Sequence, residues 1–208
     1  MLLALLDGRD LPASELAYRS GLSPTAASAH LAKLVHGGLL TVDPLGRHRF
    51  YRLANADVGH ALEALATLAK PATIVALTQD IVARKMRLAR SCYDHLAGRL
   101  GVGITESLIH RRAIAVDGER DFRVTRSGNA VFASFGVDVD AARLHRRHFA
   151  RQCRDWTERR PHLAGSLGAA VRDCFIERGW VERNPMNRSL RITESGRTAL
   201  ERHFSLEC

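Results

Sequence analysis

The sequence predicts a mainly α-helical protein with short β-hairpins, divided into two domains. Three observations carry this prediction. Residues 14–53 pass from helical apolar spacing into two short β-prone runs separated by a turn containing proline and glycine. The chain of 208 residues is long enough for a second domain of similar or larger size. Motifs within residues 95–128 return, with substitutions, within residues 162–196.

Residues 14–34 predict two short helices joined by a tight turn at Gly21. Ser23 is suited to cap the second helix, and Pro24 to occupy its first position. The apolar residues spaced for mutual packing of the two helices are Leu16, Ala17, Leu22, Ala26, Leu31 and Leu34. This pattern indicates a helix-turn-helix whose outward side chains can approach base edges in a DNA major groove. The residues of this region predicted to contact DNA are Ser23, Thr25, Ser28, His30 and Lys33.

The next residues predict a β-hairpin that follows the second helix. Gly37 and Gly38 end the helix, residues 39–42 and 47–53 are β-prone, and residues 43–46 form the turn. We interpret the hairpin as a wing. Its basic residues, expected to reach phosphates or a minor groove, are Arg47, His48 and Arg49. The alternative is a hairpin that only packs on the helices and leaves its arginines in solvent.

The motifs of this region resemble the winged helix of the ArsR/SmtB family of bacterial repressors. They are Ser-Glu-Leu-Ala at 14–17, Gly-Leu-Ser-Pro at 21–24, Ser-Ala-His-Leu-Ala-Lys-Leu at 28–34 and Gly-Arg-His-Arg-Phe-Tyr-Arg-Leu at 46–53. The resemblance covers residues 1–68. It implies a homodimeric repressor that binds a palindromic operator in double-stranded DNA and is released by an effector. The usual first helix is missing or short, and the family's cysteine pair is absent from the first helix of the motif.

The apolar runs, the cysteines and the net charge of the sequence indicate which class of protein to expect. No apolar run approaches the roughly 18 residues of a membrane span, and residues 1–6 lack the basic leader of a signal peptide. The four cysteines are not closely paired, which favours reduced thiols and a cytoplasmic protein. The net charge is +9, yet residues 1–68 hold six basic and six acidic side chains. The positive excess, which lies beyond residue 68, therefore reflects either the heavy use of arginine typical of a GC-rich genome or a second domain that contacts phosphates or an acidic effector.

Downstream of the wing, two helices are predicted. Asn55 caps a helix that runs to residue 70, and residues 73–97 carry an apolar stripe typical of a long helix. The predicted organisation is a DNA-binding domain at 1–69, a linking and dimerisation helix at 70–97, and an effector-sensing domain at 98–208. One of the two helices is expected to pair across the homodimer.

The second domain is expected to consist of two winged-helix-like repeats. His-Leu-Ala-Gly-Arg-Leu-Gly at 95–101 returns as His-Leu-Ala-Gly-Ser-Leu-Gly at 162–168, and the motif at 122–128 returns at 190–196. Each copy predicts a helix, a two-stranded hairpin and a helix capped by Thr125 or Thr193. Duplication is the economical explanation.

A polar cluster precedes each of these histidine motifs and predicts an effector site. Cys92 and His95, three apart on the expected helix, would share a face and could bind a divalent ion such as zinc. Cys153, Asp155 and His162 could complete its ligands if the repeats face each other. Three alternatives stay open. The residues could pack in the core, or hold an organic or anionic ligand with Tyr93, Trp156 and Arg159, or form a disulfide switch between Cys92 and Cys153.

The sequence favours a transcriptional regulator over an enzyme. It contains no phosphate-binding loop, no zinc-protease motif, no nucleophile elbow and no glycine-rich dinucleotide loop. An enzyme with an accessory DNA-binding domain is therefore disfavoured. A winged-helix scaffold that binds only protein is the remaining alternative, and DNA binding separates it from a regulator.

Overall fold

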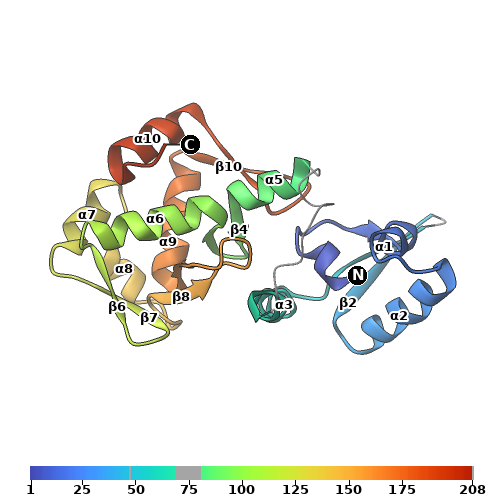
Figure 1. The fold of residues 1–208 in the computed structure, drawn as a ribbon. Helices are drawn as coiled ribbons and strands as arrows, with labels where there is room; N and C mark the ends of the chain where they lie inside the picture. Colours follow the sequence, from blue (N-terminus) through green and yellow to red (C-terminus); the bar gives the residue numbers. More distant parts are fainter. Residues whose placement is uncertain (47, 69–80, 208) are drawn as a thin grey trace. The chain divides into compact units, whose positions relative to one another are not determined.

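The computed structural model describes residues 1–46, 48–68 and 81–207, and its chain divides into two compact units, Met1–Lys70 and Pro71–Cys208 (Figure 1). Both units mix helices with small antiparallel sheets. The fold is therefore mixed α/β rather than mainly α as predicted. Among the described residues, no helix is long and apolar enough to cross a membrane.

The first unit is a helix-turn-helix with a wing. Its elements are η1 (Leu2–Leu5), β1 (Leu11–Pro12), α1 (Ala13–Arg19), α2 (Pro24–His36), β2 (Leu40–Leu45), β3 (His48–Leu53) and α3 (Ala56–Leu68). The sheet has the strand order β1-β3-β2, so β3 is central. The unit's core comprises Leu5, Leu11, Leu16, Leu31, Leu40 and Tyr51. The apolar helix spacing of the sequence thus packs α1 and α2 against the sheet.

The predicted helix boundaries of the first unit rest on identifiable caps. The Ser23 hydroxyl accepts a hydrogen bond from the Ala26 amide at 3.3 Å, with Pro24 at the first helical position. Asn55 accepts from the Val58 amide at 3.0 Å and starts α3. The wing turn is tighter than predicted, because residues 43–45 continue the strand and Leu45 pairs with His48. Strand β1 was not predicted.

The second unit has more strands than the sequence predicted. It begins with α5 (Ile81–Leu88), β4 (Arg90–Cys92), β5 (His95–Ala97), α6 (Gly98–His110), β6 (Ile114–Asp117), β7 (Asp121–Val124), α7 (Gly128–Ser134) and α8 (Val139–Arg143). It continues with β8 (Arg151–Arg154), β9 (Pro161–Ala164), α9 (Gly165–Glu177), β10 (Val181–Arg183), β11 (Leu190–Ile192) and α10 (Glu194–Phe204). Its sheets are β4-β5, β10-β11 and a four-stranded sheet ordered β6-β7-β8-β9.

The predicted linking helix over residues 70–97 is wrong at its C-terminal end. Helix α5 stops at Leu88, and residues 90–97 form the hairpin β4–β5. The backbone of this hairpin also bonds to a segment distant in the sequence: the Ser91 amide donates a hydrogen bond to the Arg188 carbonyl at 2.9 Å. Tertiary pairing therefore outweighs the local helical pattern. Residues 69–80, where the predicted helix begins, lie outside the described residues.

Two helices organise the core of the second unit. Helix α6 packs on β9, the strand that leads into α9. Helix α9 in turn packs on β5, the strand that leads into α6. Buried aromatic side chains fill the space beside them, including Phe132, Phe135, Phe175 and Phe204. The hairpins β4–β5 and β8–β9 lead directly into α6 and α9, and strands β5 and β9 lie in contact.

Candidate functional site

Helix α2 presents a polar, exposed face from its first turn onward. Thr25, Ser28, His30 and Lys33 are all exposed, while Ala27 and Leu31 on the other side are buried. The Ser28 hydroxyl donates to the Pro24 carbonyl at 2.9 Å. Ser23 was also predicted to contact DNA, but its hydroxyl accepts the capping hydrogen bond. The sequence prediction of the outward side chains therefore agrees with their exposure.

Sequence reasoning missed two members of this face. Ala29 and Ala32 are exposed and lie among the polar residues at helical spacing. Their small side chains allow a close approach to a base edge, and an alanine methyl can contact a thymine methyl. Ala29 and Ala32 stand four residues after Thr25 and Ser28, and this helical spacing signals the outward direction.

The wing carries exposed cations on a strand fixed by the core. His48 and Arg49 of β3 are exposed, whereas Tyr51 of the same strand is buried. Arg52 contacts Asp43 and lies 3.9 Å from Asp10, so acidic partners compensate its charge. Arg47 lies outside the described residues. The predicted basic tip is thus retained at His48 and Arg49.

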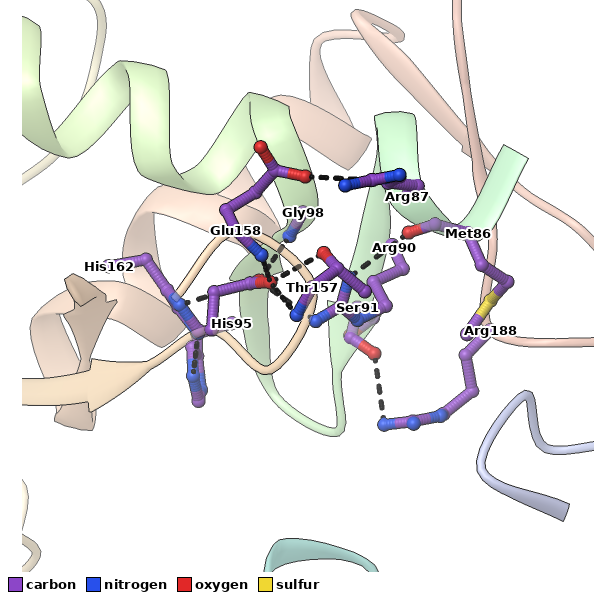
Figure 2. Close-up of polar contacts among 11 residues, drawn as sticks. Met86, Arg87, Arg90, Ser91, His95, Gly98, Thr157, Glu158, His162 and Arg188 are labelled. Atoms are coloured by element: carbon purple, nitrogen blue, oxygen red, sulfur yellow. Dashed lines mark hydrogen bonds and ion pairs between the residues drawn. The ribbon is translucent and has the colours of Figure 1, made fainter. Parts of the chain in front are cut away.

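Four of the five predicted effector residues converge inside the second unit. The ligand atoms of Cys92, His95, Cys153 and His162 all lie within 4.8 Å of one another. The two imidazole rings face each other with Nε2 atoms 3.0 Å apart (Figure 2). Cys92, His95 and His162 are buried, and Cys153 is half-buried. The cluster therefore combines two thiols and two imidazoles with one partly accessible member.

Strand pairing explains why these side chains meet. Cys92 lies opposite His95 in the β4–β5 pair, and Cys153 lies opposite His162 in the β8–β9 pair. Directly paired residues point to the same face of a hairpin. Contact between β5 and β9 brings the two Cys–His pairs together. The prediction that Cys92 and His95 share a helix face is wrong, but the hairpin has the same effect.

The last glycine of each repeated motif admits the opposite histidine. A Cβ atom on Gly101 would lie 3.7 Å from Cβ of His162, and one on Gly168 would lie 3.2 Å from Cβ of His95. Each would also meet the backbone carbonyl of the preceding strand, at 2.3 Å for Gly101 and 2.5 Å for Gly168. These glycines permit close packing of each helix on both hairpins.

Asp155 does not belong to the ligand cluster, contrary to the prediction. Its Oδ2 accepts from Arg90 Nη2 at 2.8 Å and from the Gly98 amide at 2.7 Å, and lies 3.7 Å from Nδ1 of His162. Figure 2 shows Arg90, Gly98 and Thr157 gathered at this position beside the His162 ring. Asp155 is thus a buried anchor that joins the loop after β8 to the start of α6.

The pKa values of the two histidines shift in opposite directions. Burial lowers the pKa of His95, but the Asp94 carboxylate, whose Oδ1 is 2.7 Å from Nδ1, and the Cys92 sulfur raise it to about 9. Burial lowers the pKa of His162, and the positive charge of His95 adds to that effect. A charged His95 can therefore donate Nε2–H to a neutral His162.

The aromatic residues proposed for an organic ligand already have cationic partners. The Arg90 guanidinium lies 5.3 Å from the Trp156 ring centroid, and Arg188 lies 4.4 Å from that of Tyr93. Each of these rings therefore has an arginine against it within its own unit, which weakens the organic-ligand alternative. Cys92, Cys153 and Cys174 form no disulfide among the described residues.

Comparison with known proteins agrees with the helix-turn-helix geometry. Residues 1–44 match the family model described as the IclR helix-turn-helix domain. The whole chain is 41% identical over 208 residues to an uncharacterized HTH-type transcriptional regulator, YdfF, of Bacillus subtilis (strain 168), and covers 91% of its length. The fold and this similarity define a DNA-binding transcriptional regulator. The chain belongs to the family of HTH-type transcriptional regulators that includes this relative.

The comparison corrects the family suggested by the motifs. Residues 1–44 match an IclR-type domain, and the resemblance to ArsR/SmtB repressors receives no support. The motifs responsible for the resemblance describe the winged helix itself: a capped second helix, an outward Ser–His pair and a basic hairpin. Winged-helix families share these features, because the same geometry serves the same DNA groove.

Proposed function

We propose that this regulator is a repressor that binds a palindromic operator as a homodimer and leaves it when an effector binds the second unit. The exposed polar face of α2, next to a wing with outward cations, carries this proposal. The net charge of zero for residues 1–68 means that affinity depends on local side chains rather than on a basic domain. Recognition is therefore assigned to Thr25, Ser28, His30 and Lys33, with backbone contacts from the wing.

Dimer formation is supported by the exposed apolar residues of α3. Leu65 is 62% exposed and Leu68 is 82% exposed, three residues apart on the same helix. A second copy of the helix would cover them, and a two-fold dimer reads a palindromic operator with one recognition helix in each half-site. The operator complex should accordingly contain two chains, which sedimentation of the complex can measure.

We also propose that the second unit arose by duplication of a winged-helix-like half. The order of two strands, helix, two strands, helix occurs from β4 to α7 and again from β8 to α10, with α8 between them. Thr125 accepts from the Gly128 amide at 3.1 Å and donates to the Arg112 carbonyl at 2.6 Å. Thr193 makes the equivalent bonds to Gly196 at 3.0 Å and Gly179 at 2.6 Å. Strand β8 pairs with β7, so one four-stranded sheet contains strands of both halves, while β4–β5 and β10–β11 remain separate hairpins.

Replacing Ser28 and His30 together with alanine tests the recognition surface. Both side chains are exposed, so the fold should persist while contacts with base edges are lost. Each lost base contact costs about 1–3 kcal/mol of discrimination. Gel shift with the upstream region of the regulator's own gene, against scrambled DNA of equal length, measures the loss.

The matched control is Ser134→Ala with His145→Ala in the second unit. Both residues are exposed, and the Ser134 hydroxyl donates to the Val131 carbonyl at 2.7 Å much as Ser28 donates to Pro24. This variant should discriminate as the parent does. Unchanged discrimination in the Ser28 and His30 variant would remove α2 from the recognition role, and absence of DNA binding by the parent would favour a protein-binding scaffold.

The wing should contribute affinity without sequence preference. Replacing Arg47 and Arg49 with alanine is expected to weaken binding to all DNA and to lower the slope of log affinity against log salt by about one unit per residue, since each phosphate contact releases about one counterion. Arg123→Ala, an exposed arginine of β7, is the control. A relaxed preference at a single operator base would instead assign base reading to the wing.

A further inference from the structure

We propose that Cys92, His95, Cys153 and His162 form a tetrahedral binding site for zinc or a divalent ion of similar preference, and that this ion is the effector of the regulator. The effector role rests on the proposed function, whereas the binding site does not. The two ligand pairs come from separate hairpins, β4–β5 and β8–β9, and each supplies one sulfur and one nitrogen. An ion bound here would connect the two hairpins.

The spacing of the ligand atoms suits such an ion. Zinc binds sulfur at about 2.3 Å and imidazole nitrogen at about 2.0–2.1 Å, so tetrahedral ligand atoms lie about 3.3–3.8 Å apart. The two Nε2 atoms are 3.0 Å apart, and all four ligand atoms lie within 4.8 Å. Small side-chain rotations therefore complete the geometry. Two sulfurs with two imidazoles in a tetrahedron select zinc-like ions over magnesium or calcium.

Carboxylates orient both imidazoles toward the proposed ion. Asp94 Oδ1 lies 2.7 Å from Nδ1 of His95, and Asp155 Oδ2 lies 3.7 Å from Nδ1 of His162. Nδ1 of His162 is buried and makes no hydrogen bond among the described residues. With an ion on Nε2, its Nδ1 carries the proton and faces Asp155. A carboxylate behind a ligating histidine is the usual outer support of a zinc site.

The ligand set also indicates what the site does. Four protein ligands leave no open position for a substrate, so the site is of the structural rather than the catalytic type. Two thiolates neutralise the double charge of the ion in a buried place. The hairpins that supply the ligands continue into α6 and α9, which form the centre of the unit. Ion binding would therefore fix how the two halves of the second unit pack against each other. This change in packing is how the ion would act as an effector.

The binding site is tested by titrating the metal-free, reduced full-length protein with Co²⁺. We expect one ion per chain, with the visible bands of tetrahedral cobalt and the near-ultraviolet charge-transfer band of thiolate ligands. Cys92→Ser and Cys153→Ser should each lose thiolate intensity, and Zn²⁺ should displace the cobalt. Cys174→Ser is the matched control, because Cys174 is buried outside the cluster. Its thiol donates a hydrogen bond to the Phe135 carbonyl at 3.1 Å.

A milder variant keeps the test independent of folding. Asp94 is partly exposed, and Asp94→Asn keeps the shape of the side chain while removing the charge behind His95, a charge that also pairs with Arg147. We expect it to weaken metal affinity by about 10- to 100-fold while the cobalt bands keep their positions. Octahedral cobalt spectra, or spectra unchanged by both cysteine variants, would overturn the site. A Cys92–Cys153 disulfide that forms in place of metal binding would also overturn it.

The effector role is tested by gel shift of the same samples with and without Zn²⁺. The parent should lose operator affinity on adding Zn²⁺, and Cys92→Ser and Cys153→Ser should stay bound. A protein that shows the cobalt bands but binds the operator equally well with and without Zn²⁺ contradicts the effector role and leaves the site. Operator binding without the cobalt bands contradicts the site, and with it the effector role of the ion, but not the proposed DNA binding. The cobalt bands without any DNA binding contradict the proposed function.

Discussion

Replacing Asp155 with alanine is expected to lower the free energy of unfolding by about 3–5 kcal/mol, because it leaves a buried arginine without its counter-charge. The side chains of Asp155 and Arg90 are both 0% exposed, and their ion pair spans 2.8 Å. The same carboxylate accepts hydrogen bonds from the amides of Gly98, Thr157 and Glu158. Since domains are stable by about 5–15 kcal/mol, this loss is a large fraction of the total.

Urea unfolding followed by circular dichroism, in the presence of a chelator, measures this effect without a contribution from bound metal. The control replaces both partners, Arg90→Met with Asp155→Leu, which removes the uncompensated charge. The double variant should regain part of the loss, because apolar residues of similar volume often substitute for a buried ion pair. A double variant as unstable as Asp155→Ala would assign the cost to the amide hydrogen bonds of Asp155 instead.

The first unit could be predicted closely from the sequence because its signals are local. Ser23, Pro24 and Gly21 each have a preference that acts within one turn of the backbone, and the structure uses all three as predicted. The short strand β1 has no such signal. Leu11 and Pro12 become a strand because the central strand β3 lies beside them. Local chemistry therefore defines the helices, and tertiary pairing adds the edge strand.

The cysteine–histidine cluster was predicted from spacing but with the wrong local structure. Residues three apart meet on one face of a helix, and they also meet across a two-residue hairpin, so the spacing of Cys92 and His95 is ambiguous. Tyr93 at the hairpin tip has φ of 58° without being glycine, and no turn motif precedes it. The hairpin exists because distant backbone partners near Ser189 stabilise it.

The role of Asp155 could not be read from the sequence. It stands two residues after Cys153 in a polar run, which suggests a ligand as readily as an anchor. Its partner Arg90 lies 65 residues earlier, and nothing in the sequence links the two positions. Only the fold shows that both side chains are removed from water. Burial of paired charges is a tertiary property, and local pattern does not carry it.

Replacing Gly101 with alanine should destabilise the second unit by about 1–3 kcal/mol or more, because the added methyl overpacks the contact between α6 and β5. Its Cβ would lie 2.3 Å from the Leu96 carbonyl oxygen, which is backbone and cannot rotate away. The helix would have to move from the strand, and His162 lies 3.7 Å from the same Cβ. Thermal unfolding measures the loss.

The control for this variant is Gly103→Ala, two residues further along the same helix. There the new Cβ would meet only the half-buried Leu206 side chain, at 3.2 Å, and that side chain can rotate. Alanine is a better helix former than glycine by about 0.8–1.0 kcal/mol, so this variant should be neutral or stabilising. Equal effects of the two changes on stability would mean that helix propensity, rather than close packing, determines the effect at Gly101. A loss at Gly101 alone would show that this glycine is needed for the close packing of the two hairpins that bring the histidines together.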